Sequence, residues 1–274
     1  MQKRKLDVVV LSDVHLGTYG CHAEELVSYL KTIEPKLLIL NGDIIDGWQF
    51  TKRYFPNPHF AVIKEIMNLM AKNTHVVYIT GNHDEVLRKY SDTHFGNLTL
   101  TDKYLLEIDN KRMWIFHGDV FDNTTKGSAK ILAKLGGKGY DLLILLNRAI
   151  NTILKKFGRE KVSFSKKIKN SVKKAVKYIN NFENTIAELA IGSHFDYVIC
   201  GHIHQPCKKE IVTGEGKVIY LNSGDWVENL TALEYSQQQW KIFTYDGQDF
   251  ELSHLEKMSV HDFNIFSEKV DFTF

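Results

Sequence analysis

Five short apolar runs in this 274-residue sequence each end in residues of the kinds that bind metal ions, and each of these clusters lies close to a glycine. The clusters are Asp13-Val14-His15, Gly42-Asp43, Gly81-Asn82-His83-Asp84, His117-Gly118-Asp119 and Gly201-His202-Ile203-His204. In an open α/β sheet, ligands bind outside the carboxyl ends of the strands. The sequence therefore predicts that five strand ends meet at one site, a requirement that few folds satisfy.

The alternation of apolar runs with helix-like segments predicts the fold class. In the first half, runs rich in β-branched residues are separated by segments with apolar residues at helical spacing, which is typical of parallel strands joined by helices. The strands are predicted at residues 7–11, 36–40, 75–79 and 113–116, and the helices at 23–33 and 60–70. Further strand-like runs with turns between them follow from Asp196 onward. We therefore expect an α/β fold in which a second sheet completes a layered sandwich.

Residues 121–194 interrupt this alternation because they have almost no strand character. This lack of strand character predicts a helical insertion at residues 121–194, which we interpret as a cap on a single domain spanning residues 1–274. The last helix of the insertion carries one apolar stripe, whose members are spaced mostly three or four residues apart. The stripe consists of Phe164, Ile168, Val172, Val176, Ile179, Phe182, Ile186 and Leu189.

The segment from Lys126 to Lys177 is strongly basic, with thirteen lysines and two arginines against one aspartate and one glutamate. Such segregated charge indicates an anionic partner. Basic amphipathic segments bind anionic membrane surfaces, so we expect a peripheral membrane contact. The residues expected to make this contact are Lys166, Lys167, Lys173 and Lys174. A solvated helix face is the alternative, and nucleic acid ranks lower because the nearby aromatic residues lie mostly on or close to the apolar stripe.

Composition and cysteine usage favour a cytoplasmic protein. The hydrophobic fraction of 43% and the charged fraction of 25% are ordinary for a soluble globular protein. No run approaches the roughly 18 apolar residues of a membrane-spanning helix. The apolar run after the basic start is too short for a signal peptide. The three cysteines form no CxxC pair, which argues against a disulfide framework, so we expect reduced thiols.

The five clusters contain seven candidate metal ligands, which combine imidazoles, carboxylates and one amide. They are Asp13, His15, Asp43, Asn82, His117, His202 and His204. This set is too large for one tetrahedral ion but suits two ions with a shared ligand, for which Asp43 is the natural bridging carboxylate. The absence of a thiolate favours Mn²⁺, Fe²⁺ or Zn²⁺, with Mn²⁺ expected first. Two divalent ions against two carboxylates would leave a positive centre that attracts phosphate.

The motifs SDVHLG, GDIIDG, GNHDE, HGD and GHIHQP, in this order, resemble those of the calcineurin-like metallophosphoesterases, over the whole chain apart from the insertion and the C-terminal tail. The resemblance implies a four-layer α/β/β/α sandwich and metal-dependent phosphoester hydrolysis. It implies one ion held by Asp13, His15, Asp43 and His204, and another held by Asp43, Asn82, His117 and His202. It also implies that His83 and Asn82 contact the substrate, with His83 stabilising the transition state or protonating the leaving oxygen.

Three features are similar to one branch of this family, the bacterial UDP-2,3-diacylglucosamine diphosphatases of lipid A synthesis. They are the opening SDVHLG, the segment NSGDWVEN at residues 222–229 and a helical insertion directly after HGD. This resemblance implies a nucleotide-linked lipid substrate, a lid formed by the insertion and a peripheral position on the cytoplasmic face of the inner membrane. The chain departs from the branch at His83, where an arginine is expected, and at residues 123–125, where an acidic stretch is expected.

Two alternatives stay open at this stage. The same metal chemistry could act on another phospholipid, a soluble phosphodiester or nucleic acid, or the fold could be an inactive binding scaffold, although such scaffolds typically lose ligands and this chain keeps all of them. Residues 222–229 could also form only a turn, with Trp226 in the core. We interpret Asp46, Asp84 and Asp119 as groups that form turns or orient the ligands. The tail at residues 258–274 is assigned no role.

Overall fold

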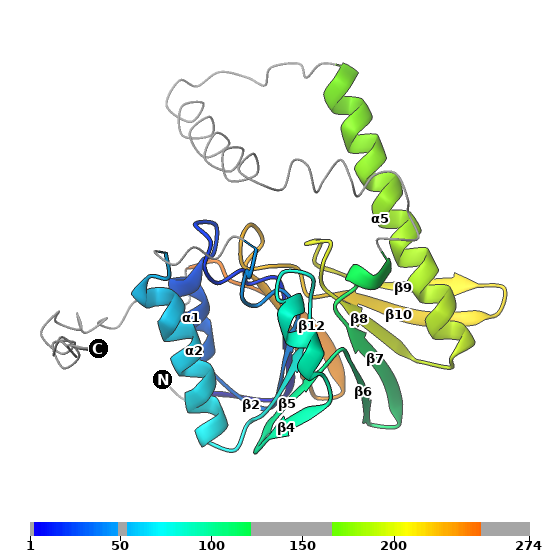
Figure 1. Cartoon of the computed structure of the whole chain (residues 1–274). Coiled ribbons are helices and arrows are strands. Elements are labelled where there is room, and N and C mark those ends of the chain that lie inside the picture. Colours follow the sequence, from blue (N-terminus) through cyan, green and yellow to red (C-terminus); the bar gives the residue numbers. More distant parts are fainter. Residues whose placement is uncertain (1–2, 49–53, 122–165, 248–274) are drawn as a thin grey trace, which may run out of the picture.

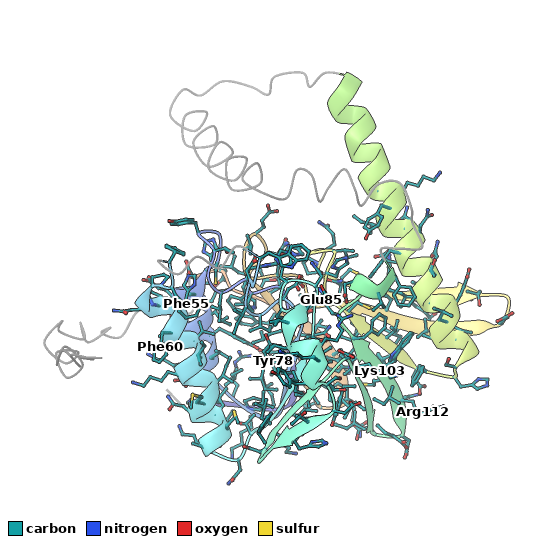
Figure 2. The ribbon with its side chains drawn as sticks, viewed as in Figure 1. Phe55, Phe60, Tyr78, Glu85, Lys103 and Arg112 are labelled. Carbon is teal, nitrogen blue, oxygen red and sulfur yellow. The ribbon has the colours of Figure 1, made fainter. Side chains whose placement is uncertain are left out.

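The computed structural model describes residues 3–48, 54–121 and 166–247, and within 166–175 it describes the backbone only. Two β-sheets are stacked face to face, and helices cover their outer faces (Figure 1). This is the four-layer α/β/β/α sandwich predicted from the sequence. Side chains fill the space between the layers (Figure 2).

The first sheet has seven strands in the order β12-β11-β1-β2-β3-β5-β4. Their bounds are β1 (Arg4–Leu11), β2 (Ile33–Asn41), β3 (His75–Ile79), β4 (Thr93–Phe95), β5 (Leu98–Thr101), β11 (Thr231–Ser236) and β12 (Gln239–Thr244). The neighbours β1, β2, β3 and β5 run parallel, while β11 pairs antiparallel with β1. The carboxyl ends of β1, β2 and β3 therefore lie at the same edge.

The second sheet has five strands in the order β6-β7-β8-β10-β9. Their bounds are β6 (Lys103–Ile108), β7 (Lys111–Phe116), β8 (Tyr197–Cys200), β9 (Cys207–Thr213) and β10 (Gly216–Asn222). The strands β7, β8 and β10 are parallel neighbours. The two predicted clusters that follow β7 and β8 therefore also come from adjacent strand ends.

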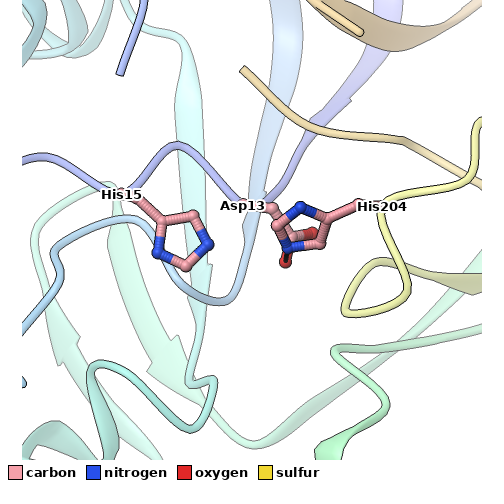
Figure 3. A group of neighbouring side chains, drawn as sticks. All are labelled: Asp13, His15 and His204. Atoms are coloured by element: carbon pink, nitrogen blue, oxygen red, sulfur yellow. Dashed lines mark ion pairs between the residues drawn. The ribbon is translucent and has the colours of Figure 1, made fainter. Parts of the chain in front are cut away.

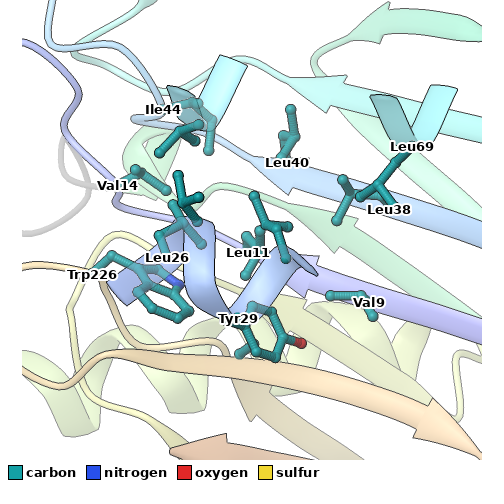
Figure 4. Close-up of a cluster of buried hydrophobic side chains, with 14 of the residues drawn as sticks. Val9, Leu11, Val14, Leu26, Tyr29, Leu38, Leu40, Ile44, Leu69 and Trp226 are labelled. Carbon is teal, nitrogen blue, oxygen red and sulfur yellow. The ribbon is translucent and has the colours of Figure 1, made fainter. Parts of the chain in front are cut away.

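Helices α1 (Ala23–Lys31) and α2 (Asn57–Ala71) cover the outer face of the first sheet. Leu26 of α1 and Leu69 of α2 are buried with Trp226 in this layer (Figure 4). On the other side, α5 (Lys166–Gly192) packs against the second sheet with its C-terminal half, and its N-terminal half extends beyond the sandwich (Figure 1). A short 3-10 helix, η1 (Glu85–Tyr90), follows the third cluster.

Strand β1 shows why the apolar runs are continuous rather than alternating. Val9 and Leu11 pack toward α1 and α2, whereas Val8 and Val10 face the second sheet. Successive side chains of a strand point to opposite faces, so a strand buried on both faces needs apolar residues at nearly every position. The core between the sheets thus fixes β1 in the middle of the first sheet, with its carboxyl end at the site.

Most predicted strands and both early helices are confirmed, with two differences from the prediction. The strands between residues 93 and 108 were not predicted, because β4 and β5 are very short, β6 lies at a sheet edge, and all three carry polar residues. In α5, the buried face runs through Phe182, Ile186 and Ala190. The predicted stripe members Val176 and Leu189 are instead 50% and 47% exposed, because Val176 lies in the N-terminal half of α5 and Leu189 lies off the helix face that contains Ile186 and Ala190.

Residues 122–165 of the predicted insertion lie outside the described residues, so its remaining part stays a prediction. In the described part of the chain, no helix has both the length and the apolar character needed to cross a membrane.

Candidate metal centre

The turns after β1 and β2 run side by side and carry the first ligand candidates. The backbone N–H of Asp13 donates to the carbonyl of Gly42 at 3.1 Å, and that of His15 donates to the carbonyl of Asp43 at 2.9 Å. These bonds continue the parallel pairing of the two strands beyond the sheet. They place the three candidate side chains of both turns in one region, as the strand-end pattern predicts.

The turns from the second sheet are joined in the same way. The N–H of Gly201 donates to the carbonyl of His117 at 3.0 Å, and the N–H of His202 donates to Asp13 Oδ2 at 3.0 Å. The second of these bonds connects the two sheets directly. A ligand candidate of the first turn therefore also fixes the backbone of the last one.

The candidate side chains converge, and Asp43 lies in the middle of them. His117 Nε2 lies 3.2 Å from Asp43 Oδ2, and His204 Nε2 lies 3.0 Å from Asp13 Oδ1 (Figure 3). Three groups have ligand atoms within 4.8 Å of one another. They are Asp13 with His15 and His204, Asp43 with His117 and His202, and His15 with Asp43 and His83. Two of these groups match parts of the two ligand sets that the family resemblance implies.

Among the described residues, four buried atoms of the candidate ligands have no hydrogen bond of good geometry, although Asp13 Oδ1 and His117 Nε2 lie within ion-pair distance of His204 and Asp43. The four atoms are Asp13 Oδ1, His15 Nε2, Asn82 Oδ1 and His117 Nε2. Buried polar atoms almost always have a partner, so such a group in one place needs an explanation. The ring of His117 shows the arrangement best, because its Nδ1 donates to the carbonyl of Asn41 at 2.9 Å and leaves Nε2 for a metal ion. The residues therefore fit divalent ions.

Buried charges in the centre stabilise each other. Burial alone would raise the pKa of the Asp13 carboxyl, but the imidazole of His204 lowers it to about 2. Burial would likewise raise the pKa of Asp43, and the neighbouring His117 and His15 hold it below its ordinary value. The pKa of His204 is raised to about 9 by Asp13 against the effect of burial. The carboxylates are thus ionised and favour positive charge between them.

Five candidate ligands have left-handed backbone conformations. The φ angles are 53° at Asp13, 54° at His15, 55° at Asp43, 66° at His202 and 52° at His204. Residues other than glycine rarely adopt such angles, which cost on the order of 1–3 kcal/mol each and cluster at functional sites. The strained turns direct side chains from different strands toward one point.

Two glycines of the clusters are required by this crowding. A Cβ on Gly42, whose φ is +79°, would lie 2.4 Å from the ring of His117. A Cβ on Gly81 would lie 2.2 Å from Asp43 Oδ1. Both distances are far below van der Waals contact, so only glycine allows the ligand side chains to approach the neighbouring turns.

His83 lies beside the ligands and is held by two carboxylates. Its Nδ1 is 2.9 Å from Asp46 Oδ2, and its backbone N–H donates to Asp43 Oδ1 at 2.8 Å. The same Asp46 oxygen is 3.2 Å from His15 Nδ1. Burial lowers the pKa of His83, but the bond to Asp46 raises it above its ordinary value overall. Asp46 thus orients one candidate ligand and one candidate catalytic side chain, as the sequence interpretation allowed.

The other two aspartates of the clusters form turns and ion pairs. Asp84 accepts hydrogen bonds from the backbone of Ile44 and Gly81, at 3.0 and 2.6 Å. Asp119 pairs with Arg88 of η1 at 2.9 Å. Neither belongs to the groups of close ligand atoms among the described residues. The interpretation of these aspartates as supporting residues agrees with these contacts.

The segment at residues 222–229 has a structural role that its sequence left open. Trp226 is fully buried in the core, and Asp225 accepts backbone N–H bonds from the residues that follow it, including Val227 at 2.8 Å. Asp225 Oδ2 also lies 3.9 Å from His204 Nδ1. The segment therefore supports a candidate ligand as well as the core.

Trp48 is a residue near the site that sequence analysis missed. Its ring centroid lies 4.3 Å from that of His83, yet the residue is 63% exposed. One face of the indole thus covers the candidate catalytic histidine, and much of the ring stays open to solvent. A single tryptophan outside any periodic pattern gave no signal, although its position five residues after Asp43 is on the ligand turn.

The lysines predicted to contact a membrane lie in the first part of α5. Lys166, Lys167, Lys173 and Lys174 have helical backbones, as expected, and their side chains lie outside the described residues.

Curated relatives of two kinds are similar to this chain. The DNA double-strand break repair protein Mre11 of Methanococcus maripaludis is 23% identical over 284 residues, covering 96% of this chain and 69% of that protein. The UDP-2,3-diacylglucosamine hydrolase of Shigella sonnei is 24% identical over 191 residues, covering 69% of this chain and 77% of that protein. Among solved structures, the phosphoesterase Yfce from E. coli has a TM-score of 0.44 at 13% identity, covering 88% of this chain and 94% of that one.

The family itself is identified by a match over most of the chain. Residues 6–206 match the model described as Calcineurin-like phosphoesterase, and this range includes all five clusters. The chain therefore belongs to the calcineurin-like phosphoesterase family, and it is a metal-dependent hydrolase.

Proposed function

We propose that this phosphoesterase holds two divalent metal ions, Mn²⁺ in the first place, and hydrolyses the pyrophosphate of a nucleotide-linked lipid. The observation that carries the metal assignment is the convergence of buried ligand atoms within 4.8 Å of one another, beside His15 Nε2 and Asn82 Oδ1, which have no hydrogen-bond partner among the described residues. Two sets of residues would hold the ions and share Asp43. They are Asp13, His15, Asp43 and His204 for one ion, and Asp43, Asn82, His117 and His202 for the other.

The side chains around the ions have separate tasks in this mechanism. Two divalent ions at this site would activate water for attack on phosphorus and offset the charge of the phosphoryl oxygens. His83 donates a proton to the leaving oxygen, because Asp46 holds its Nδ1 and its Nε2 faces Asp43 at 4.0 Å. Asn82 offers its amide nitrogen to a phosphoryl oxygen while its Oδ1 serves as a ligand.

UDP-2,3-diacylglucosamine is the substrate we propose, with UMP and 2,3-diacylglucosamine 1-phosphate as products. The similarity to a hydrolase named for this substrate extends over 69% of the chain. The open ring of Trp48 beside His83 provides an apolar surface next to the bond that is cleaved. Both observations support a substrate whose phosphate carries a large ring or apolar group.

The basic segment supports a peripheral position on the cytoplasmic face of the inner membrane. The half of α5 that contains Lys166 and Lys174 extends beyond the sandwich (Figure 1), and juxtamembrane lysines add about 1 kcal/mol each on an anionic surface. Flotation with phosphatidylglycerol vesicles tests this. Binding should weaken with salt and when Lys166, Lys167, Lys173 and Lys174 are changed to Glu, and unchanged binding of that variant would refute the contact.

The hydrolytic activity is tested with UDP-2,3-diacylglucosamine and added Mn²⁺, following UMP release, with a soluble aryl phosphodiester in parallel. We expect turnover of both, with kcat/KM at least tenfold higher on the lipid. Turnover of the aryl ester alone would refute the lipid substrate and leave the metal chemistry intact. No turnover of either, from protein that contains two ions, would refute the catalytic assignment.

A nucleic-acid phosphodiester is the second candidate substrate, and one observation favours it. The relative named as a DNA repair protein is similar over 96% of this chain, and the segment 126–177 has a large positive charge. Incubation of single-stranded and double-stranded DNA with the Mn²⁺-loaded protein separates the candidates. Cleavage that disappears in Asp43→Ala would support the nuclease, since a contaminating nuclease would be unaffected.

A further inference from the structure

Phe182 of α5 is buried against the metal centre, although it belongs to the predicted insertion. The residue is 2% exposed and packs in the outer core of the second sheet. A Cβ on Gly118 would lie 2.8 Å from Phe182 Cζ and 3.3 Å from the Cβ of His202. The phenyl ring and His202 therefore both border the space that a side chain at position 118 would need, so the turn after His117 packs closely against both.

The rings form a continuous row from α5 to the centre of the site. The centroid of Phe182 is 6.2 Å from that of His202, which is 5.2 Å from that of His117. His117 Nε2 is in turn 3.2 Å from Asp43 Oδ2. Because protein interiors are close-packed, a cavity in place of the Phe182 ring would free the rings of His202 and His117 to move.

Glu183, the next residue of α5, leads through a chain of contacts to the turn that contains His202. It is 3% exposed and forms an ion pair with Lys209 of β9, whose Nζ lies 5.6 Å from the ring centroid of Tyr220. The hydroxyl of Tyr220 accepts a hydrogen bond from Asn222 Nδ2 at 3.3 Å, and the same amide donates to the carbonyl of Gly201 at 2.7 Å. Gly201 directly precedes His202 in the sequence. Phe182 and Glu183 thus both connect α5 to the turn after β8. Phe182 reaches it through the ring of His202, and Glu183 reaches it through contacts that end at the carbonyl of Gly201.

We propose that Phe182 is a positioning residue for the metal centre, which holds His117 and His202 in register and so couples one of the two ions to the helix that ends the insertion. Neither Phe182 nor Glu183 offers a ligand atom to the close groups of the site. The proposal rests on the two-ion assignment made above and not on the choice of substrate. Outer residues that orient ligands typically contribute 10–100-fold to metal affinity.

The experiment measures metal content and affinity of the full chain, without relying on turnover. Wild-type protein and Phe182→Ala are loaded with Mn²⁺, dialysed and analysed by plasma mass spectrometry, and a chelator competition then gives the two Kd values. We expect two ions in the wild type. In Phe182→Ala, one Kd should rise about 10–100-fold and the other should change by less than threefold. Phe182→Leu, which keeps apolar bulk, should recover most of the lost affinity.

Ile186→Ala is the matched control, because Ile186 lies one turn further along α5, is fully buried and packs in the same core cluster. It should lower Tm by a similar amount and retain both ions with wild-type affinity. Equal metal affinities in Phe182→Ala and Ile186→Ala would overturn the proposal. If Phe182→Ala does not fold, Phe182→Val, which fills less of the ring's space than Phe182→Leu, against Ile186→Val gives the same comparison. A wild type without bound metal would overturn the two-ion assignment itself.

Discussion

The two halves of the sandwich support the metal centre by different means. In the first half, the turns after β1 and β2 bond to each other through their backbones, and two short helices cover the sheet behind them. In the second half, one backbone bond joins the turns after β7 and β8, and these turns also rest on side chains of α5, a helix that extends beyond the sandwich (Figure 1). The first half of the site is therefore built from local pairing, whereas the second depends on a helix that belongs to the insertion.

Removing the carboxylate shared by both halves should have the largest effect. Asp43→Ala is expected to lose both ions and to lower kcat/KM by roughly 10³-fold or more, since metal ions contribute several kcal/mol to such reactions. Metal content and initial rates measure this. Asp7→Ala is the control, because Asp7 pairs with Lys36 at the surface, away from the candidate ligands. An Asp43→Ala protein that keeps two ions would show that the halves bind metal separately.

Changing His83 tests a side chain that the first half alone positions. His83→Gln should lower kcat by about 10²–10⁴-fold with both ions retained, because a general acid contributes that much. Asp46→Asn should give a smaller loss, of about 10–100-fold, since it acts through His83 and His15. Steady-state kinetics with metal analysis distinguishes this from loss of metal, and a normal kcat in His83→Gln would contradict the proton-donor role.

Metal removal should loosen the second half more than the first. After chelation, amide hydrogen exchange is expected to increase most around His117 and His202, because a single backbone bond joins their turns and the rest of their support comes from side-chain packing on α5. The turns at Asp13 and Asp43 keep their mutual backbone bonds and should change less. An equal increase in amide hydrogen exchange at all four turns, measured by mass spectrometry, would contradict the distinction between the halves.

Trp48→Ala should affect substrate binding without affecting stability. The residue is 63% exposed, so Tm should shift little, while KM for a ring-bearing substrate should rise about fivefold or more from the loss of stacking. Phe95→Ala is a suitable control, because Phe95 is 60% exposed on the edge strand β4. A similar KM change in both variants would exclude a specific contact by Trp48.

The smallest effect is expected at Asp196, where the chain returns from α5 to β8. Burial would raise the pKa of its carboxyl, but the bonds from Lys111 Nζ and the Arg112 N–H lower it overall. A lowered pKa in the folded state stabilises the protein above the unfolded value of about 3.9, and this contribution is lost as pH falls. Asp196→Asn should therefore be slightly less stable at pH 7, and its difference from wild type should shrink as pH falls below about 3.9, as measured by urea unfolding.

The sequence predicted the parts of the site that depend on strand ends. Asp13, Asp43 and His117 follow buried strands, so their convergence was expected from parallel-sheet geometry. Phe182 was predicted only as an apolar stripe member, because its packing on Gly118 depends on where α5 crosses the second sheet. The open ring of Trp48 was missed for a related reason: contacts between distant segments leave no periodic signal.

The edge strands illustrate the same limit for the fold. Strand β6 (Lys103–Ile108) alternates exposed and half-buried residues, so it lacks the apolar run that marks β1. It is a strand because β7 pairs with it. Propensity alone does not decide such segments, since their conformation is determined by the partner strand.

The bond from the His202 N–H to Asp13 Oδ2 joins residues 189 positions apart. During synthesis, the first half of the site leaves the ribosome long before its second half exists, so a nascent chain offers only an incomplete set of ligands. Contacts of such long sequence separation form late in folding. Full metal binding would therefore mark the completion of folding, and a chain truncated before residue 202 should bind metal weakly however well its first sheet is formed.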